Sequence, residues 1–314
     1  MKRRVLLQLV PLLGPTGALA QGLPPISKPT APPALPSPPP ALLLRRAIPS
    51  SGEQIPVVGL GSWITFNVGN DRGARAQCTE VMRAFFGAGG RLIDSSPMYG
   101  SSQAVIGDGL QQLAAQSQVF SADKVWTSAP GAGQIETSRQ LWRVPAFDLL
   151  QVHNLLAWQA QLPLLQGMKA AGRLRYVGVT TSEGRRHSDI EQIMRTQRID
   201  FVQLSYNLLD REAEERLLPL AQERGIAVLV NRPFRQGDLL RQLQRHPLPA
   251  WAGEIDCASW AQIALKFVVS HPAVTCAIPA TSSVTHVREN MAAALGRLPA
   301  EAFRKRMAGY VSGL

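Results

Sequence analysis

Cysteine is scarce in this 314-residue chain, and its three cysteines stand far apart. Cys78, Cys257 and Cys276 form no Cys-x-x-Cys pair, which argues against a structural zinc site and against a disulfide framework. We therefore expect no metal. Because the count is odd, at least one thiol is free, and the simplest interpretation is three buried, unpaired cysteines.

Dense runs of one charge are also absent, although the formal net charge is +11. The basic residues are scattered singly or in pairs such as Arg45-Arg46 and Arg185-Arg186, without interleaved aromatic side chains. Net charge alone is weak support for nucleic-acid binding, which would depend steeply on salt. We expect no nucleic-acid partner, and the charge indicates a basic surface that aids solubility and attracts anions.

The N-terminal apolar stretch is too short to span a membrane, so no stable membrane anchor is expected. A charged start, Met1-Lys2-Arg3-Arg4, precedes the apolar residues 5–14 and the small-x-small sequence Ala18-Leu19-Ala20. These three features together predict a secretory signal peptide over residues 1–20. We therefore expect an exported, periplasmic protein.

Two export routes fit this signal. The segment Arg3-Arg4-Val5-Leu6-Leu7 resembles a twin-arginine signal, whose route carries folded proteins, and an ordinary secretory signal remains the alternative. Residues 21–44, which include nine prolines between Pro24 and Pro40, are predicted to be an extended linker. The folded domain is then expected over residues 45–314, and the sequence leaves its oligomeric state open.

Short apolar runs alternate with amphipathic stretches from residue 55 onward. The predicted strands cover residues 56–61, 91–94, 119–125, 147–152, 174–180, 200–205, 226–231 and 274–278. The predicted helices cover residues 75–88, 101–116, 134–142, 157–171, 188–197, 211–224, 256–270 and 284–294. Eight strand–helix pairs in about 260 residues match the usual size of a (β/α)₈ TIM barrel.

A doubly wound sheet is the rival fold, and it needs a Gly-x-Gly-x-x-Gly turn after the first strand. The segment Gly59-Leu60-Gly61-Ser62-Trp63 has only two glycines, so the barrel is favoured. Catalytic groups of such barrels gather at the carboxyl ends of the strands. Polar residues end four of the predicted strands, which points to one shared pocket; they are Asp94, Lys124, His153 and Gln203.

These residue types suit proton donation to a carbonyl oxygen. A free tyrosine has a pKa of about 10, and a neighbouring ammonium lowers it by favouring the phenolate. Asp94 would hold Lys124 charged, Lys124 would tune Tyr99 as the acid, and His153 would orient the carbonyl oxygen. None of the four donates a hydride, so a reductase also needs a bound cofactor.

Three segments of the sequence resemble the aldo-keto reductase family. Residues 94–100 (Asp-Ser-Ser-Pro-Met-Tyr-Gly) are similar to the family segment with the catalytic Asp and Tyr. Residues 120–126 (Phe-Ser-Ala-Asp-Lys-Val-Trp) are similar to the strand with its Lys, and residues 148–153 (Asp-Leu-Leu-Gln-Val-His) to the strand with its His. The resemblance covers roughly residues 45–312. It implies that Asp94, Tyr99, Lys124 and His153 form the catalytic tetrad of a reductase acting on aldehydes and ketones.

The resemblance also implies a nicotinamide cofactor, NADP by family habit, with NAD as the alternative. Gln203 matches the residue that holds the carboxamide, and family members place the adenosine phosphates at the last loop and the helix that follows it. Thr180 and Thr181 replace a common Ser-Asn pair. The cofactor-binding residues implied in this way are Thr180, Thr181, Gln203, Asn231, Arg232, Phe234, Ile278, Ala280, Thr281, Ser282, Arg288 and Asn290.

The sequence departs from the family pattern at two further places in this cofactor site. Relatives that prefer NADP usually have Lys or Arg early in the last loop, where this chain has small neutral residues. Arg288, one turn into the next helix, is the candidate to bind a 2′-phosphate instead. The usual aromatic that stacks on the nicotinamide is absent from Asn231-Arg232-Pro233-Phe234, which leaves Tyr206 or the Arg232 guanidinium for that role.

Two other functions remain open. The chain could be a non-catalytic, nicotinamide-binding regulatory subunit, as some family members are. It could also be a lyase or aldolase in which Lys124 forms a Schiff base with a carbonyl substrate.

Overall fold

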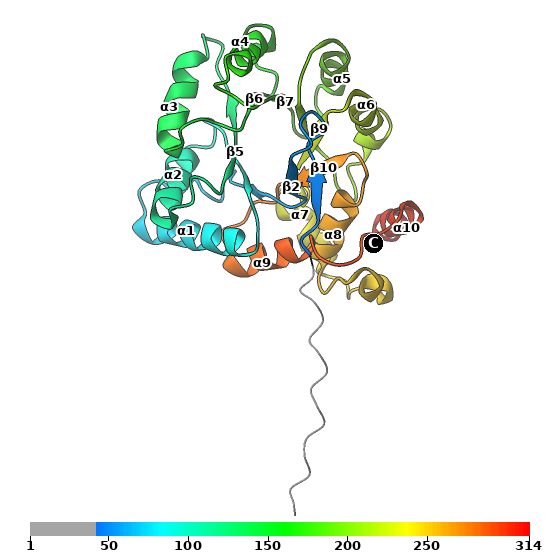
Figure 1. The fold of residues 1–314 in the computed structure, drawn as a ribbon. Helices are drawn as coiled ribbons and strands as arrows, with labels where there is room; N and C mark the ends of the chain where they lie inside the picture. Colours follow the sequence, from blue (N-terminus) through cyan, green and yellow to red (C-terminus); the bar gives the residue numbers. More distant parts are fainter. Residues whose placement is uncertain (1–41) are drawn as a thin grey trace, which may run out of the picture. The chain divides into compact units, whose positions relative to one another are not determined.

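The computed structural model describes residues 42–314, which form a sheet of eight parallel strands with helices around it (Figure 1). The predicted signal peptide and residues 21–41 of the predicted linker lie outside the described residues. Of the remaining predicted linker, Leu43 and Leu44 pack against the hydrophobic core. The Leu44 N–H also donates to the Ala294 carbonyl at 2.8 Å.

The strands of the sheet are neighbours in chain order, each parallel to the next. They are β3 (Leu60–Gly61), β4 (Leu92–Asp94), β5 (Phe120–Val125), β6 (Leu149–His153), β7 (Tyr176–Thr180), β8 (Phe201–Ser205), β9 (Ala227–Asn231) and β10 (Val274–Ala277). Each of the eight predicted strand regions overlaps one of these strands, and β6 ends at His153, one residue beyond the predicted range 147–152. The first is shorter than predicted: Pro56 pairs with Arg45 in another sheet, and Val58 makes only an isolated bridge with Ala277.

The first and last strands of the sheet also approach each other. Parallel bridges join Val58 to Ala277 and Gly61 to Ala280, and the Gly61 N–H donates to the Pro279 carbonyl at 3.0 Å. A Cβ on Gly61 would lie 2.7 Å from the Ile278 carbonyl oxygen, so only glycine allows this close approach. The curved eight-stranded sheet is consistent with the predicted (β/α)₈ barrel.

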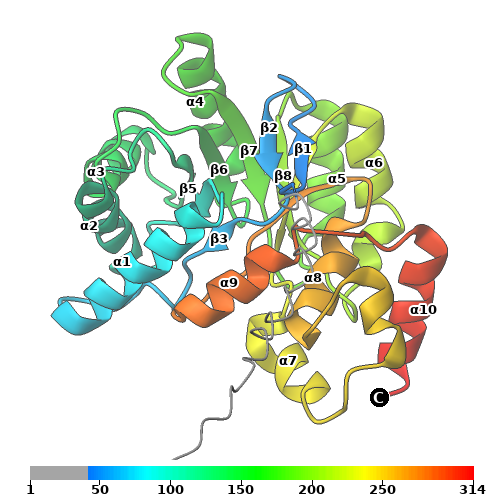
Figure 2. The same cartoon turned by 60° about the horizontal axis from the view of Figure 1, so that its bottom comes forward.

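The helices follow the strands along the chain. They are α1 (Arg72–Gly87), α2 (Ser102–Leu113), α3 (Ala132–Trp142), α4 (Trp158–Ala170), α5 (His187–Thr196), α6 (Leu217–Arg224), α7 (Asp238–Leu243), α8 (Trp260–Val269), α9 (Val284–Ala292) and α10 (Glu301–Ser312). α8 begins four residues later than predicted because the Ser259 side chain caps it, accepting from the Gln262 N–H. α7 and α10, which flank α8 in Figure 2, were not predicted.

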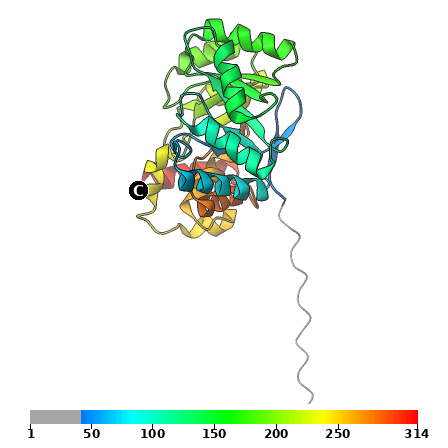
Figure 3. The same ribbon diagram turned by 90° about the vertical axis from the view of Figure 1, so that its left-hand side faces the viewer.

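A hairpin at the start of the domain was also missed. β1 (Arg45–Ala47) pairs antiparallel with β2 (Gln54–Pro56), and the hairpin lies across one end of the sheet's interior (Figures 1 and 3). Ile48 and Ile55 from this hairpin are fully buried in a cluster with the inward side chains of the strands, including Phe120 and Phe201. Because this cluster fills the end where the strands begin, a cavity inside the sheet can open only at the other end.

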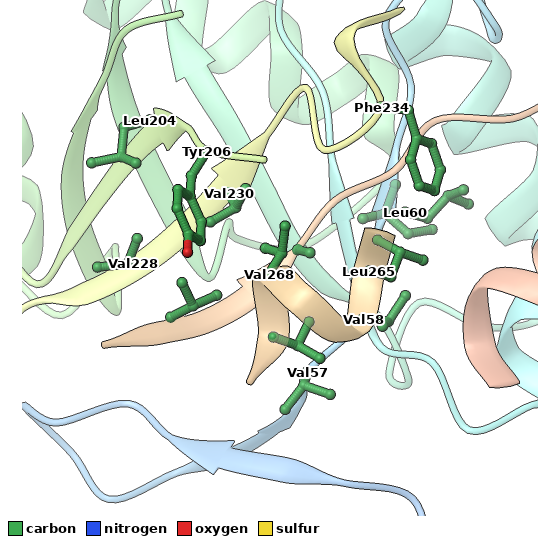
Figure 4. Packing of buried hydrophobic residues seen from close by; sticks show 14 of the residues in the cluster. Val57, Val58, Leu60, Leu204, Tyr206, Val228, Val230, Phe234, Leu265 and Val268 are labelled. Atoms are coloured by element: carbon green, nitrogen blue, oxygen red, sulfur yellow. The ribbon is translucent and has the colours of Figure 1, made fainter. Parts of the chain in front are cut away.

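A second, larger cluster fills the space between the strands and the helices (Figure 4). Leu204, Val228 and Val230 point outward from their strands into it, and Leu265 and Val268 meet them from α8. The three cysteines are buried and unpaired, as predicted. No helix within residues 42–314 is long and apolar enough to cross a membrane.

Candidate active site

The strands carry polar side chains beyond the inner apolar cluster. Side chains two residues apart on a strand point to the same face. Asp94 therefore follows Leu92 on the inside, Lys124 follows Ala122, and Gln203 follows Phe201. The alternation that builds the inner core thus delivers one polar group per strand to the same end of the sheet.

Asp94 and Lys124 form a buried ion pair at this end. Lys124 Nζ lies 2.6 Å from Asp94 Oδ2 and donates a second hydrogen bond to the Ser95 carbonyl at 2.8 Å. The Lys124 side chain is 0% exposed. Burial acts to lower the pKa of Lys124, but its interactions with Asp94, Tyr99 and Asp123 together outweigh burial, with the Asp94 charge first among them, so this pKa lies above its usual value. Lys124 is therefore a fixed cation.

Tyr99 lies beside this cation. Lys124 Nζ is 5.0 Å from the centre of the Tyr99 ring, and the ring meets His153 edge-on at a centroid distance of 5.7 Å. Burial raises the pKa of Tyr99, and the Lys124 charge opposes that rise without cancelling it. The pKa lowering expected from the sequence is therefore outweighed by burial, and the phenol keeps its proton at neutral pH.

His153 is neutral. Burial, with a smaller contribution from the Lys124 charge, lowers the pKa of His153 to about 2. Its Nδ1 lies 2.7 Å from Ser96 Oγ, which already accepts from the Met98 N–H. Either atom can donate in this hydrogen bond; when the Ser96 hydroxyl donates to Nδ1, the imidazole proton resides on Nε2. Ser96 lies within a segment that resembles the family, but no pattern in the sequence indicates this role.

An amide cluster adjoins the ion pair. Gln203 Nε2 donates to Asp94 Oδ1 at 2.8 Å, and Gln203 Oε1 lies 3.2 Å from Thr180 Oγ1 and 3.3 Å from Asn231 Nδ2. Asn231 Nδ2 also donates to the Thr181 carbonyl at 2.8 Å. These bonds link Thr180 and Asn231, through Gln203, to the Asp94 carboxylate; all three are predicted cofactor residues.

A cavity of about 540 Å³ opens above this cluster. Asp94, Tyr99 and His153 line it, and Lys124 lies buried beneath. The predicted cofactor residues that line it are Thr180, Thr181, Gln203, Asn231, Arg232, Phe234, Ile278, Ala280, Thr281 and Asn290.

Two predicted cofactor residues do not line the cavity. Ser282 and Arg288 are exposed outside it. His286 and Glu289 of α9 do line it, and Arg288 is two residues, about 200° of helical turn, from His286. Arg288 therefore points away from the cavity. It is not placed to meet a 2′-phosphate there.

Of the two candidates for stacking on a nicotinamide, Tyr206 is excluded. It is fully buried among outward-facing residues such as Val228 and Val230 (Figure 4), and its hydroxyl accepts from Arg304 at 2.6 Å. Arg232 lines the cavity, where Glu183 holds its guanidinium at 2.9 Å.

The cavity wall fits a polar ligand. Thr181 Oγ1 and Arg232 Nε are buried without a hydrogen-bond partner among residues 42–314. Buried polar atoms without partners are costly, so they indicate groups that a bound molecule satisfies. A dinucleotide rich in phosphate and amide groups supplies such partners.

Asp123 is a buried acid behind the site. Its side chain is 0% exposed on the outer face of β5, where Oδ2 accepts from Gln103 Nε2 of α2 at 2.7 Å. The same Gln103 amide donates to Ser138 of α3. Burial raises the pKa of Asp123 to about 7, although the Lys124 charge opposes the rise.

Replacement of Asp123 with Asn is expected to change how stability depends on pH. An unfolded aspartate titrates near pH 3.9, so between about pH 4 and 7 the folded wild type holds a proton that the unfolded chain has lost. Wild-type stability therefore falls as pH rises through this window. Relative to wild type, Asp123→Asn should gain about 2 to 3 kcal/mol between pH 5 and pH 8, measured by denaturant unfolding. Parallel pH profiles would contradict this, and Asp238→Asn, at an exposed aspartate, is the control.

Comparison with known proteins identifies the family of the chain. The model of the aldo/keto reductase family matches residues 57–307. Methylglyoxal reductase YeaE of Escherichia coli (strain K12) is 28% identical over 258 residues, which cover 79% of this chain and 89% of that protein. The NADH-specific methylglyoxal reductase of the same organism is 25% identical over 230 residues, covering 62% and 68%.

Solved structures share the fold. An aldo-keto reductase from Klebsiella pneumoniae in complex with NADPH superposes with a TM-score of 0.72 at 23% identity, covering 86% of this chain and 96% of that one. Another from that organism, in complex with NADP and acetate, gives a TM-score of 0.70 at 24% identity, covering 83% and 93%. Since the family model spans most of the sequence, the chain belongs to the aldo/keto reductase family.

Proposed function

We propose that this protein is an NAD(P)H-dependent reductase of aldehyde and ketone carbonyls, built on a closed (β/α)₈ barrel. One observation carries the proposal: the Lys124 ammonium, held 2.6 Å from Asp94, lies 5.0 Å from the centre of the Tyr99 ring, at the cavity that Tyr99 and His153 line. This arrangement supports a site in which a proton donor, a fixed cation and a neutral imidazole act on one carbonyl oxygen.

Each side chain has one task in this proposal. The His153 Nε2–H donates a hydrogen bond to the carbonyl oxygen and orients it. The Tyr99 hydroxyl gives its proton to that oxygen as negative charge develops there, and Lys124 stabilises the phenolate left behind. Asp94 keeps Lys124 charged and in place. A reduced nicotinamide, when bound, supplies the hydride.

The proposed cofactor-binding residues form two groups, one for each end of the cofactor. Gln203, Asn231 and Thr180 would hold the carboxamide end, because their amides and hydroxyl adjoin Asp94. Arg232 and the loop Ile278–Thr281 would meet the phosphates, because they line the cavity and Arg232 Nε lacks a partner among residues 42–314. We propose NADP as the cofactor, with NAD as the alternative.

The Schiff-base alternative is disfavoured by the state of Lys124. A Schiff base needs a neutral, accessible amine. Lys124 is 0% exposed, makes two hydrogen bonds, and has a pKa above its usual value. Borohydride trapping with a carbonyl substrate and no nicotinamide should therefore leave the protein unmodified.

The purified protein tests the main proposal directly. NADPH and NADH are titrated while tryptophan fluorescence is recorded, and turnover is then measured with aldehydes, ketones and quinones. Methylglyoxal belongs in this panel because two relatives are named for it. Saturable binding with turnover supports a reductase, whereas binding without turnover of any carbonyl supports the regulatory-subunit alternative.

We also propose that the protein is exported, through the twin-arginine route. The proposal rests on the signal-like residues 1–20, and on the reasoning that a protein which binds its cofactor while folding suits a route for folded proteins. Replacing Arg3 and Arg4 with lysine should leave the protein in the cytoplasm, as measured by fractionation. Unimpaired export of this variant would refute the twin-arginine route and leave the ordinary secretory one.

A further inference from the structure

A second cavity opens on the outer side of the sheet, among the helices. Its volume is about 490 Å³, close to that of the active-site cavity, and residues of α6, α8 and α10 line it. None of its lining residues belongs to the cavity that Tyr99 and His153 line. We call it the outer cavity. A ligand bound there would not touch the catalytic residues.

Arg304 of α10 lines the outer cavity with unused hydrogen-bonding capacity. The residue is 7% exposed, and its Nη2 donates to Tyr206 Oη and to Glu214 Oε1, both at 2.6 Å. Its Nε is buried and has no hydrogen-bond partner among residues 42–314. Arginine presents five N–H donors in a planar fork, so the two bonds of Nη2 leave most of this fork for another acceptor.

Arg211 is the second guanidinium at the outer cavity. In the part of the chain that the structure describes, it takes part in no ion pair, and its Nε is likewise buried without a hydrogen-bond partner. Buried polar atoms without partners are costly, so they mark places where a bound group supplies the partner. Arg232, the third arginine of residues 42–314 with such an Nε, lines the active-site cavity.

Other donors face the outer cavity as well. His271 Nδ1 accepts from the Ala273 N–H at 3.1 Å, and burial lowers the pKa of His271 to about 4, so the neutral ring carries its proton on Nε2. Ala300 and Glu301 line the cavity where α10 begins, and no side chain caps that end of the helix. Uncapped N–H groups at the start of a helix attract an anion.

The two carboxylates at the outer cavity are already paired with cations. Glu214 pairs with Arg304 at 2.6 Å, and Glu301 pairs with Lys305 at 2.6 Å. Arg211 adds a third positive charge to the same lining, against two negative ones. The excess is one positive charge, and it belongs to the arginine that has no carboxylate partner.

Apolar side chains complete the wall of the outer cavity. The Arg304 guanidinium lies over the Phe267 ring, 5.2 Å from its centre, and Pro219, Pro272 and Pro299 also line the cavity. A volume of about 490 Å³ is in the range of small-molecule sites, which combine apolar walls with a few polar groups. The ligand should therefore carry an apolar body as well as a negative charge.

We propose that the outer cavity binds an organic anion in which a phosphate or carboxylate group is attached to a compact apolar body. Arg211 and Arg304 hold the charged group, with the uncapped start of α10 beside them. Phe267 and the three prolines cover the apolar body. The site does not depend on the proposed reductase function.

Three small molecules test this site by calorimetry on the full-length protein. Phenyl phosphate carries both parts of the proposed ligand, inorganic phosphate carries only the charge, and phenol carries only the ring. Phenyl phosphate should bind severalfold more tightly than either of the other two compounds. Excess NADP should leave this affinity unchanged, because the two cavities share no lining residue.

Three variants assign the binding to the outer cavity. Arg211→Gln removes a charge without breaking an ion pair of residues 42–314, and should weaken phenyl phosphate binding by about tenfold, the effect of losing a charge-assisted hydrogen bond. Arg304→Lys keeps a cation beside Glu214 but removes the planar fork, and should also weaken binding. Arg173→Gln, at an exposed arginine outside the cavity, is the matched control and should bind as the wild type does.

Several results would overturn the outer-cavity site. They are no binding of phenyl phosphate, binding that excess NADP abolishes, and equal affinities of the wild type and Arg211→Gln. Tighter binding of inorganic phosphate than of phenyl phosphate would do so too, since the apolar wall would then contribute nothing. Failure of the protein to reduce any carbonyl would count against the reductase function alone, because calorimetry measures binding apart from turnover.

Discussion

The Tyr99→Phe variant is expected to lose carbonyl reduction by a factor of about 10² to 10⁴ in kcat/KM. The change removes one hydroxyl, and with it the only proposed proton donor of the cavity. Burial raises the pKa of Tyr99, so the phenol is fully protonated at neutral pH and able to donate. The neutral His153, with its pKa lowered to about 2, cannot replace it as an acid. Steady-state kinetics with the best aldehyde measures the effect.

The same variant should bind NADPH nearly as tightly as the wild type. The ring of Tyr99 remains, and its edge-on contact with His153 does not need the hydroxyl. A fluorescence titration therefore distinguishes a lost proton donor from a damaged site. Tyr310→Phe, at an exposed tyrosine of α10, is the control and should keep full activity. Full activity of Tyr99→Phe would show that the proton comes from another group.

Replacing Lys124 with methionine should be the most destabilising change at the site, at about 3 to 5 kcal/mol of unfolding free energy. Lys124 neutralises Asp94 inside the protein, where the Asp94 side chain is 3% exposed and the Lys124 side chain 0%. Methionine fills a similar volume but leaves the carboxylate buried without its cation. The loss is measured by denaturant unfolding at pH 7. Activity should vanish as well, because no cation would remain to stabilise the Tyr99 phenolate.

The double variant Lys124→Met with Asp94→Asn separates these two effects. Removing both charges together should restore part of the stability, since no uncompensated charge remains in the core. It should not restore reduction. A double variant as unstable as Lys124→Met alone would mean that packing, rather than charge, causes the loss. Lys305→Met breaks the exposed pair with Glu301 on α10 and should not measurably change stability.

The alternation of inward-facing and outward-facing side chains along each strand explains which site residues could be predicted from the sequence. Asp94, Lys124 and His153 lie at or next to the carboxyl ends of buried strands, and Gln203 lies in the middle of β8. Chain order alone brings such strands side by side in a parallel sheet. The same alternation excludes Tyr206 from stacking on the nicotinamide, because Tyr206 lies three residues beyond the inward-facing Gln203 and therefore faces the helices. Helical spacing likewise turns Arg288 away from the cavity.

Other features leave no periodic signal. The three-residue strands β1 and β2 are too short to show an alternation, so the hairpin could not be separated from the predicted first strand. The pKa of Tyr99 depends on burial, and burial of a loop residue is a property of the folded structure. The left-handed conformation of Ile64 is equally unpredictable, because that region is rare for isoleucine.

The β1–β2 hairpin also determines the route that molecules take through the site. Ile48 and Ile55 join the apolar cluster that fills one end of the sheet's interior, so this end is shut. The interior of the sheet is then open at one end only, and the nicotinamide and the carbonyl compound must enter through the same opening. If the dinucleotide lies deeper, against Gln203 and Asn231, it arrives first and departs last. The kinetics should therefore follow an ordered sequence, in which the alcohol leaves before the spent dinucleotide.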